Sequence, residues 1–89
     1  MNEVEERLQG YLVERSAALL QIDPSAVLWE ADVDEYGYDS MRVNQLCVEI
    51  SRDFQIYVQP VIFLEASSLE AVSQYLLQNY PQSIESKLL

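Results

Sequence analysis

Histidine is absent from this 89-residue chain, cysteine occurs once, and glycine (2) and proline (3) are rare. Without histidine, a serine or cysteine nucleophile lacks its most common general base, and a single cysteine cannot form an internal disulfide. Basic residues are also few: 5 lysines and arginines stand against 15 acidic residues, giving a formal net charge of −10. That charge opposes binding to nucleic acid and favours partners with basic surfaces.

Long hydrophobic runs are missing too. No stretch approaches the roughly 20 apolar residues that a transmembrane helix needs, so we expect no membrane contact. The N-terminus also lacks the basic segment and apolar stretch of a secretion signal. These absences predict a cytoplasmic protein.

The hydrophobic content of 49% is enough for one small domain with one core. Apolar residues recur at helical spacing through most of the chain, and the scarcity of glycine and proline fits the same structure. We therefore predict an all-α fold, a small four-helix bundle of three main helices plus one short helix, in a monomeric protein. The bundle is expected to cover residues 1–80. Residues 81–89 have no sustained period and are expected to be a tail, either disordered or a linker.

Four segments carry the helical signal. The first spans residues 4–22 and ends where Asp23-Pro24 disfavours helical geometry. The second runs from Ser40 to Phe54, and the third covers residues 61–64. The last begins at residue 69, where Ser67 and Ser68 both offer caps and Glu70 follows Ser67 as in a capping box, and it ends at Pro81. The residues expected to face the core are Val4, Leu8, Tyr11, Leu12, Arg15, Leu19 and Ile22 in the first segment, Val43, Leu46, Cys47, Ile50 and Phe54 in the second, and Leu69, Val72, Leu76 and Tyr80 in the last.

Residues 23–39 form a long loop that contains six acidic residues and no basic one. A loop of this length in so small a domain is usually functional. The alternative is that its carboxylates only keep it solvated. Its apolar residues are too many to lie in water, so we expect the loop to pack across the helix ends as a lid; they are Val27, Leu28, Trp29, Val33 and Tyr36.

Ser40 lies where this acidic loop meets the second helix, in the sequence Tyr36-Gly37-Tyr38-Asp39-Ser40-Met41. Gly37 allows a positive φ, and either Asp39 or Ser40 can cap the helix. The free N–H groups and the dipole at a helix start favour an anion bonded at that point. Ser40 is therefore a candidate attachment site for a phosphate group. The alternative is that Ser40 is only an N-cap.

The outer face of the second helix carries two apolar residues, Met41 and Val48, where a purely solvated face would be polar. Exposed apolar residues are common, so structure alone can explain them. Their position beside Ser40 favours instead a surface on which partners dock. The members of this surface on the helix are Met41, Asn44, Gln45, Val48 and Arg52.

Nucleophilic catalysis fits the sequence poorly. Ser40 is followed two residues later by Arg42 and not by the second glycine of a Gly-x-Ser-x-Gly elbow, and no histidine is available for a triad. Cys47 lies on the core face of its helix, where a buried and inert thiol is expected.

A calcium site fits poorly as well. Asp32, Asp34 and Gly37 imitate the start of an EF-hand loop. The fifth position is Tyr36, however, and the twelfth, which needs a bidentate glutamate, is Val43. We therefore expect no metal site.

Two short motifs link the chain to a known family. Gly37-Tyr38-Asp39-Ser40-Met41 matches a Gly-x-Asp-Ser-Leu motif, with methionine in place of leucine, and residues 64–69 are similar to a Phe-Glu-x-Pro-Thr-Leu segment. In the second motif Leu64 is expected to keep the core role of the phenylalanine. Over about residues 4–80 the chain thus resembles acyl carrier proteins of the phosphopantetheine-binding family, and among these the carrier domains of polyketide synthases.

The resemblance implies that a phosphopantetheinyl transferase moves 4′-phosphopantetheine from coenzyme A to Ser40. The protein, itself not an enzyme, would hold acyl or polyketide intermediates as thioesters on this arm. It would deliver them to the ketosynthase, acyltransferase and other enzymes of a polyketide or fatty-acid type synthase. The alternative is a non-catalytic helical docking module whose Ser40 stays unmodified. The residues that the resemblance assigns to contacts with the transferase and the later enzymes are Asp39, Met41, Gln45 and Val48.

Overall fold

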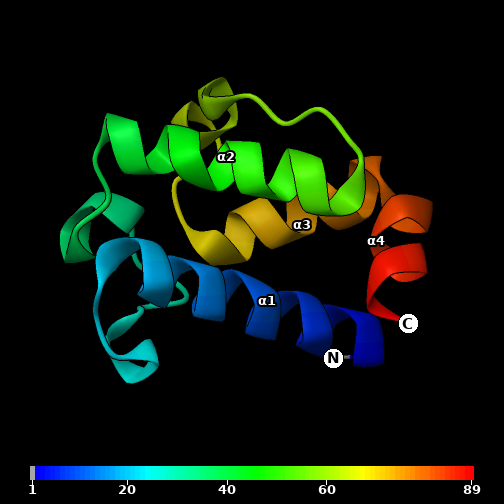
Figure 1. Cartoon of the computed structure of the whole chain (residues 1–89), viewed down its shortest axis with the longest axis horizontal. Coiled ribbons are helices and arrows are strands. Elements are labelled where there is room, and N and C mark those ends of the chain that lie inside the picture. Colours follow the sequence, from blue (N-terminus) through cyan, green and yellow to red (C-terminus); the bar gives the residue numbers. More distant parts are fainter. Residues whose placement is uncertain (1) are drawn as a thin grey trace.

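Four α-helices surround one core in the computed structural model, which describes residues 2–89 (Figure 1). No strand occurs in this described part of the chain. The predicted all-α fold with four helices is therefore confirmed. Helix α1 spans Glu3–Leu20, α2 Ser40–Phe54, α3 Leu69–Asn79 and α4 Pro81–Leu88, and three short 3-10 helices lie in the connections: η1 (Pro24–Ala26), η2 (Val33–Tyr36) and η3 (Pro60–Leu64).

Local chemistry sets the helix ends. The side chains of Asn2, Asp39 and Ser68 cap α1, α2 and α3 by accepting a hydrogen bond from the backbone N–H three residues later. Helices α1 and α2 end at Gln21 and Gln55, which adopt the left-handed conformation (φ 57° and 56°) that commonly terminates helices. The second helix has the predicted bounds, whereas the first ends two residues earlier than expected.

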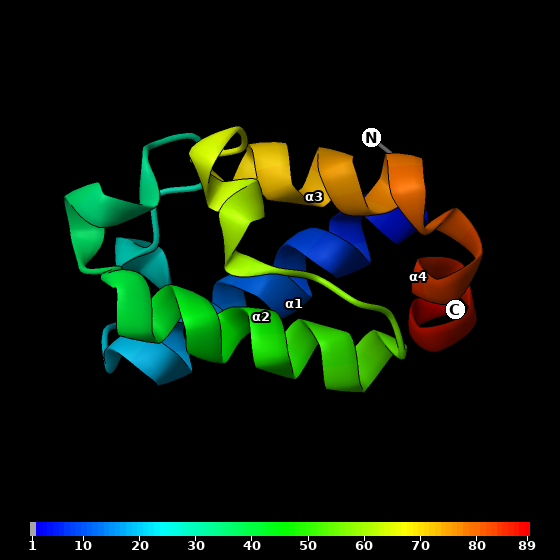
Figure 2. The ribbon, with the colours of Figure 1, turned by 90° about the horizontal axis from the view of Figure 1, so that it is seen from above.

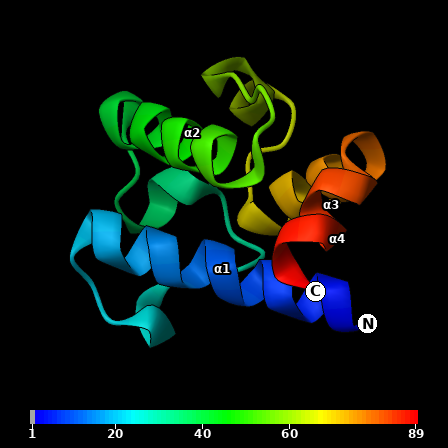
Figure 3. The same cartoon turned by 45° about the vertical axis from the view of Figure 1, so that its right-hand side comes forward.

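Helix α1 contacts all three other α-helices, and α4 contacts α2 and α3 as well (Figures 1 and 3). After α2 the connector of residues 55–59 runs back toward the start of α2, and brings η3 to that end of the molecule (Figure 2). The core draws on every α-helix. Its hydrophobic residues without any exposed surface are Leu8, Leu12, Leu46, Ile50, Leu69, Val72, Leu76 and Ile84.

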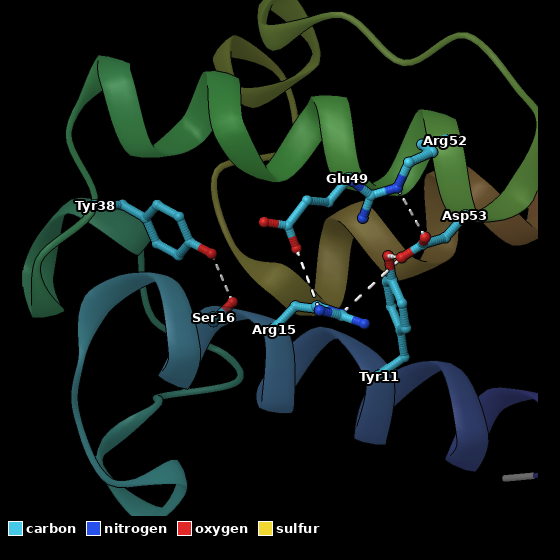
Figure 4. Close-up of polar contacts among 7 residues, drawn as sticks. All are labelled: Tyr11, Arg15, Ser16, Tyr38, Glu49, Arg52 and Asp53. Atoms are coloured by element: carbon cyan, nitrogen blue, oxygen red, sulfur yellow. Dashed lines mark hydrogen bonds and ion pairs between the residues drawn. The ribbon is translucent and has the colours of Figure 1, made fainter.

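A polar cluster joins α1 to the C-terminal half of α2 (Figure 4). The Tyr11 hydroxyl donates to Asp53 Oδ2 over 2.7 Å, and Arg15 lies 3.7 Å from Glu49 and 4.0 Å from Asp53. The hydrogen bond from Tyr11 lowers the pKa of Asp53, so the carboxylate is charged at neutral pH. Arg15 is 46% exposed, so its predicted place in the buried stripe is wrong. The buried positions of α1 are Leu8, Leu12, Ser16 and Ala17.

The predicted disordered or linker tail is helical. Pro81 occupies the first position of α4, where its missing N–H costs nothing, and Ile84 is fully buried against the bundle. Two apolar residues spaced by four, Ile84 and Leu88, give this helix one inward face. The fourth α-helix is therefore α4, whereas the predicted short helix after Pro60 is the 3-10 helix η3.

Three smaller expectations are also corrected. Leu64 is 84% exposed and does not take the core role of a phenylalanine, because the short turn of η3 directs Ile62 inward instead. Leu28 is 47% exposed, so it does not belong to the buried side of the loop, although Val27 and Val33 do. Of the two serines expected to cap α3, Ser68 provides the cap, so the capping box of Ser67 with Glu70 does not form.

Candidate functional site

Ser40 is the first residue of α2, and its side chain is exposed. The cap is Asp39, whose Oδ1 accepts from the N–H of Arg42 over 2.8 Å. The Ser40 hydroxyl makes no hydrogen bond to any part of the chain that the structure describes, and neither do the N–H groups of Ser40 and Met41. The hydroxyl is thus free to react, beside two free donors that favour an anionic group.

The turn before Ser40 has one inward side chain. Gly37 has φ 124°, a conformation that residues with a Cβ rarely adopt. Tyr38 follows and is buried, and its hydroxyl lies 2.7 Å from Ser16 Oγ on α1 (Figure 4). Burial raises the pKa of Tyr38 to about 12, so the phenol is protonated at neutral pH. After Tyr38 the chain returns to the surface at Asp39 and Ser40.

A pocket of about 310 Å³ opens beside Ser40. Its lining combines three apolar residues, Val33, Val43 and Phe63, with carboxylates of the loop. Val43, predicted as a core residue, is only partly buried because it lines this pocket. The complete lining is Asp32, Val33, Asp34, Tyr38, Asp39, Ser40, Val43, Phe63 and Ser67.

The pocket joins segments that are far apart in the sequence. Ser67 Oγ donates to Asp32 Oδ1 over 2.6 Å, and the Val33 N–H donates to the Ser67 carbonyl over 2.9 Å. These bonds fasten the acidic loop to the turn between η3 and α3. Sequence reasoning missed Phe63 and Ser67 as site residues, because only the return of the connector brings them to the start of α2.

All six residues predicted for partner docking are exposed. Five of them lie on α2 and Asp39 lies directly before it. Met41 and Val48 are 66% and 57% exposed, which is high for apolar side chains. The six residues, which we term the α2 docking face, are Asp39, Met41, Asn44, Gln45, Val48 and Arg52.

Further exposed apolar residues lie next to α2. Tyr57 on the connector and Val61 and Leu64 on η3 are 73%, 57% and 84% exposed, and η3 packs against α2. Sequence reasoning missed them. The available signal was the run of four apolar residues from Val61 to Leu64, because a single short turn cannot bury four successive side chains.

Other features of the structure concern thiol chemistry, metal binding and the hydropathy of the helices. Cys47 is 1% exposed, and burial raises the pKa of its thiol to about 11, so it is a poor nucleophile. Among residues 2–89 no group of three or more potential ligands is arranged to hold a metal ion. Over the same residues, none of the helices has both the length and the hydropathy to cross a bilayer.

Comparison with known proteins agrees with the family resemblance of the sequence motifs. Residues 10–76 match the family described as "Phosphopantetheine attachment site". The chain is similar to the polyketide synthases PksN (22% identity over 82 residues, 92% of this chain) and PksM (26% over 83 residues, 93% of this chain) of Bacillus subtilis (strain 168). It spans only 2% of the length of either relative. No solved structure gives a significant match.

Proposed function

We propose, from the premise that this chain belongs to the family of phosphopantetheine attachment domains, that Ser40 is its attachment residue. The protein is a non-catalytic acyl carrier of the polyketide synthase type, and its cofactor is covalent 4′-phosphopantetheine. The observation that supports Ser40 is its exposed hydroxyl, which no capping bond occupies because Asp39 is the cap. An N-cap serine would instead have its side-chain oxygen engaged with a backbone N–H of the helix.

The proposed loading step is a phosphoryl transfer. The Ser40 Oγ attacks the phosphorus of coenzyme A that bears the pantetheine unit, and a phosphodiester bond forms while the P–O bond to the adenosine bisphosphate half breaks. The hydroxyl proton goes to a base on the transferase, because the chain has no histidine and Asp39 is engaged with the Arg42 N–H.

The surroundings of Ser40 suit the group. The free N–H groups of Ser40 and Met41 lie at the positive end of the α2 dipole, next to the point where a phosphodiester would be attached. The lining of the adjacent pocket includes the apolar residues Val33, Val43 and Phe63, which suit the uncharged part of the arm. When bound, the arm supplies a thiol that holds acyl groups as thioesters and keeps them at a high local concentration near each enzyme of the synthase.

We further propose that the α2 docking face binds a phosphopantetheinyl transferase and the ketosynthase, acyltransferase and other enzymes of a synthase. Carrier domains of this family work with synthase enzymes in general. The exposed Met41 and Val48 support apolar contacts, and the net charge of −10 supports partners with basic surfaces. The monomeric state and the cytoplasmic location expected from the sequence remain proposals.

Loading can be tested by mass spectrometry of the intact chain. We expect wild-type protein, incubated with coenzyme A and a broad-specificity phosphopantetheinyl transferase, to gain the mass of one phosphopantetheine. Proteolysis should then locate the added mass on the peptide that contains Ser40. A chain that gains nothing would instead support the alternative, a helical docking module with an unmodified serine.

Docking can be tested with the same transferase as the probe. Met41→Ala and Val48→Ala each remove an exposed apolar contact, so we expect KM for the carrier to rise roughly fivefold, about 1 kcal/mol of binding energy, while kcat stays unchanged. Leu28→Ala is the matched control, because Leu28 is exposed but lies on the loop outside this face. An unchanged KM in both α2 variants would show that the transferase does not use the face.

A further inference from the structure

We propose that Tyr38 is a positioning residue, which holds Ser40 in place for modification through its hydrogen bond to Ser16 on α1; this inference rests on the proposed role of Ser40. Tyr38 is 4% exposed, whereas its neighbours Gly37, Asp39 and Ser40 are exposed. Within residues 37–40 it is thus the one side chain that is buried in the core.

The contact between Tyr38 and Ser16 has the geometry of a strong hydrogen bond. The two oxygens lie 2.7 Å apart, the most common distance for an O–H···O bond, and either hydroxyl can donate. Ser16 has no exposed surface, so water cannot replace either partner. Because the phenol of Tyr38 is protonated at neutral pH, the bond persists under the conditions of loading.

Polar contacts attach α1 to the region of α2 near both ends of α2. Near the C-terminal end, the Tyr11 hydroxyl is bonded to Asp53, and Arg15 forms ion pairs with Glu49 and Asp53. Near the N-terminal end, Tyr38 to Ser16 is the only side-chain hydrogen bond to α1 from residues 37–43 within the described chain (Figure 4). Loss of the N-terminal attachment leaves the other in place, so the fold should survive while the first turn of α2 gains freedom.

Freedom at that turn should slow the reaction. The Ser40 oxygen must approach phosphorus in line and at close range, and small displacements of a reacting group reduce rates steeply. Phenylalanine at position 38 would still fill the core but could not fix the direction of the turn. Tyr38 therefore contributes to the rate of modification through the position of Ser40.

A double-mutant cycle separates this role from a purely structural one. Ser16→Ala leaves the buried Tyr38 hydroxyl without a partner and should destabilise the fold, whereas Tyr38→Phe combined with Ser16→Ala removes both polar groups and should restore most of the stability. The double variant still lacks the hydrogen bond between positions 38 and 16. We therefore expect near-wild-type unfolding in denaturant but a loading kcat reduced roughly 3- to 10-fold.

Tyr11→Phe is the matched control, because it removes the equivalent phenol bond at the other end of α2. It should lower stability without slowing the loading of Ser40. A double variant that loads at the wild-type rate, or a Tyr11→Phe variant that is slowed equally, would overturn the positioning role. If wild-type protein gains no arm at all, the proposed function itself is wrong and the positioning role falls with it.

Discussion

The Ser40→Ala variant should gain no phosphopantetheine under conditions in which every wild-type molecule is loaded. Alanine removes the oxygen that the proposed phosphodiester requires and changes little else. The Ser40 side chain is exposed and makes no hydrogen bond within residues 2–89. Alanine is also the residue with the highest helix propensity. The free energy of unfolding should therefore change by less than about 0.5 kcal/mol. A loss of loading would then report on chemistry and not on folding.

Ser67→Ala is the matched control for this experiment, because Ser67 is the other serine that lines the pocket. Its hydroxyl donates a hydrogen bond to Asp32 over 2.6 Å, so we expect that it does not accept phosphopantetheine. We expect Ser67→Ala to gain one full arm with at most a modest loss of stability. Residual loading of Ser40→Ala that disappears in the double variant would show that Ser67 is modified, and would contradict the assignment to Ser40.

Sequence reasoning worked best where local chemistry decides the structure. The bounds of α2, Ser40 to Phe54, followed from a cap residue and from apolar residues at helical spacing. The same periodicity identified its outer face, where Met41 and Val48 are indeed exposed. A helix constrains its own neighbours three and four residues apart, so such features can be read from the sequence.

Contacts between distant segments could not be read in this way. Nothing in the sequence pairs Asp32 with Ser67 or Tyr38 with Ser16, because each pair meets only after the loop and the connector have folded. A serine such as Ser16, at an inward position of α1 four residues after Leu12, signals that a polar partner is needed. Which residue supplies it depends on the packing of α2 against α1.

The C-terminal segment shows why periodicity alone can mislead. Residues 81–89 contain few apolar positions, so they carried no helical signal by themselves. The preceding helix, α3, ends at Asn79, and Pro81 then starts a new helix whose single buried residue, Ile84, completes the core. A short helix with so few inward residues is stabilised by tertiary packing and not by its own propensity.

The Ile50→Ala and Ile84→Ala variants should each lower the free energy of unfolding by roughly 2–5 kcal/mol. Both side chains are fully buried, so each variant loses apolar contact and leaves a cavity. Gln45→Ala and Glu85→Ala are the matched exposed controls on the same two helices, and should change stability by less than about 0.5 kcal/mol. Unfolding in denaturant at neutral pH measures all four differences.

The pairing of these variants tests two separate statements about the bundle. A large loss for Ile50→Ala with a small one for Gln45→Ala supports the inward and outward faces of α2, and therefore the exposure of the α2 docking face. Ile84→Ala tests α4, because an unstructured tail would tolerate the substitution as readily as Glu85→Ala. If the two α4 variants were equally stable, the carrier would be complete without this helix. A large loss at Ile84 would instead make α4 part of the core that holds α1 and α2 together, and with them the turn that carries Ser40.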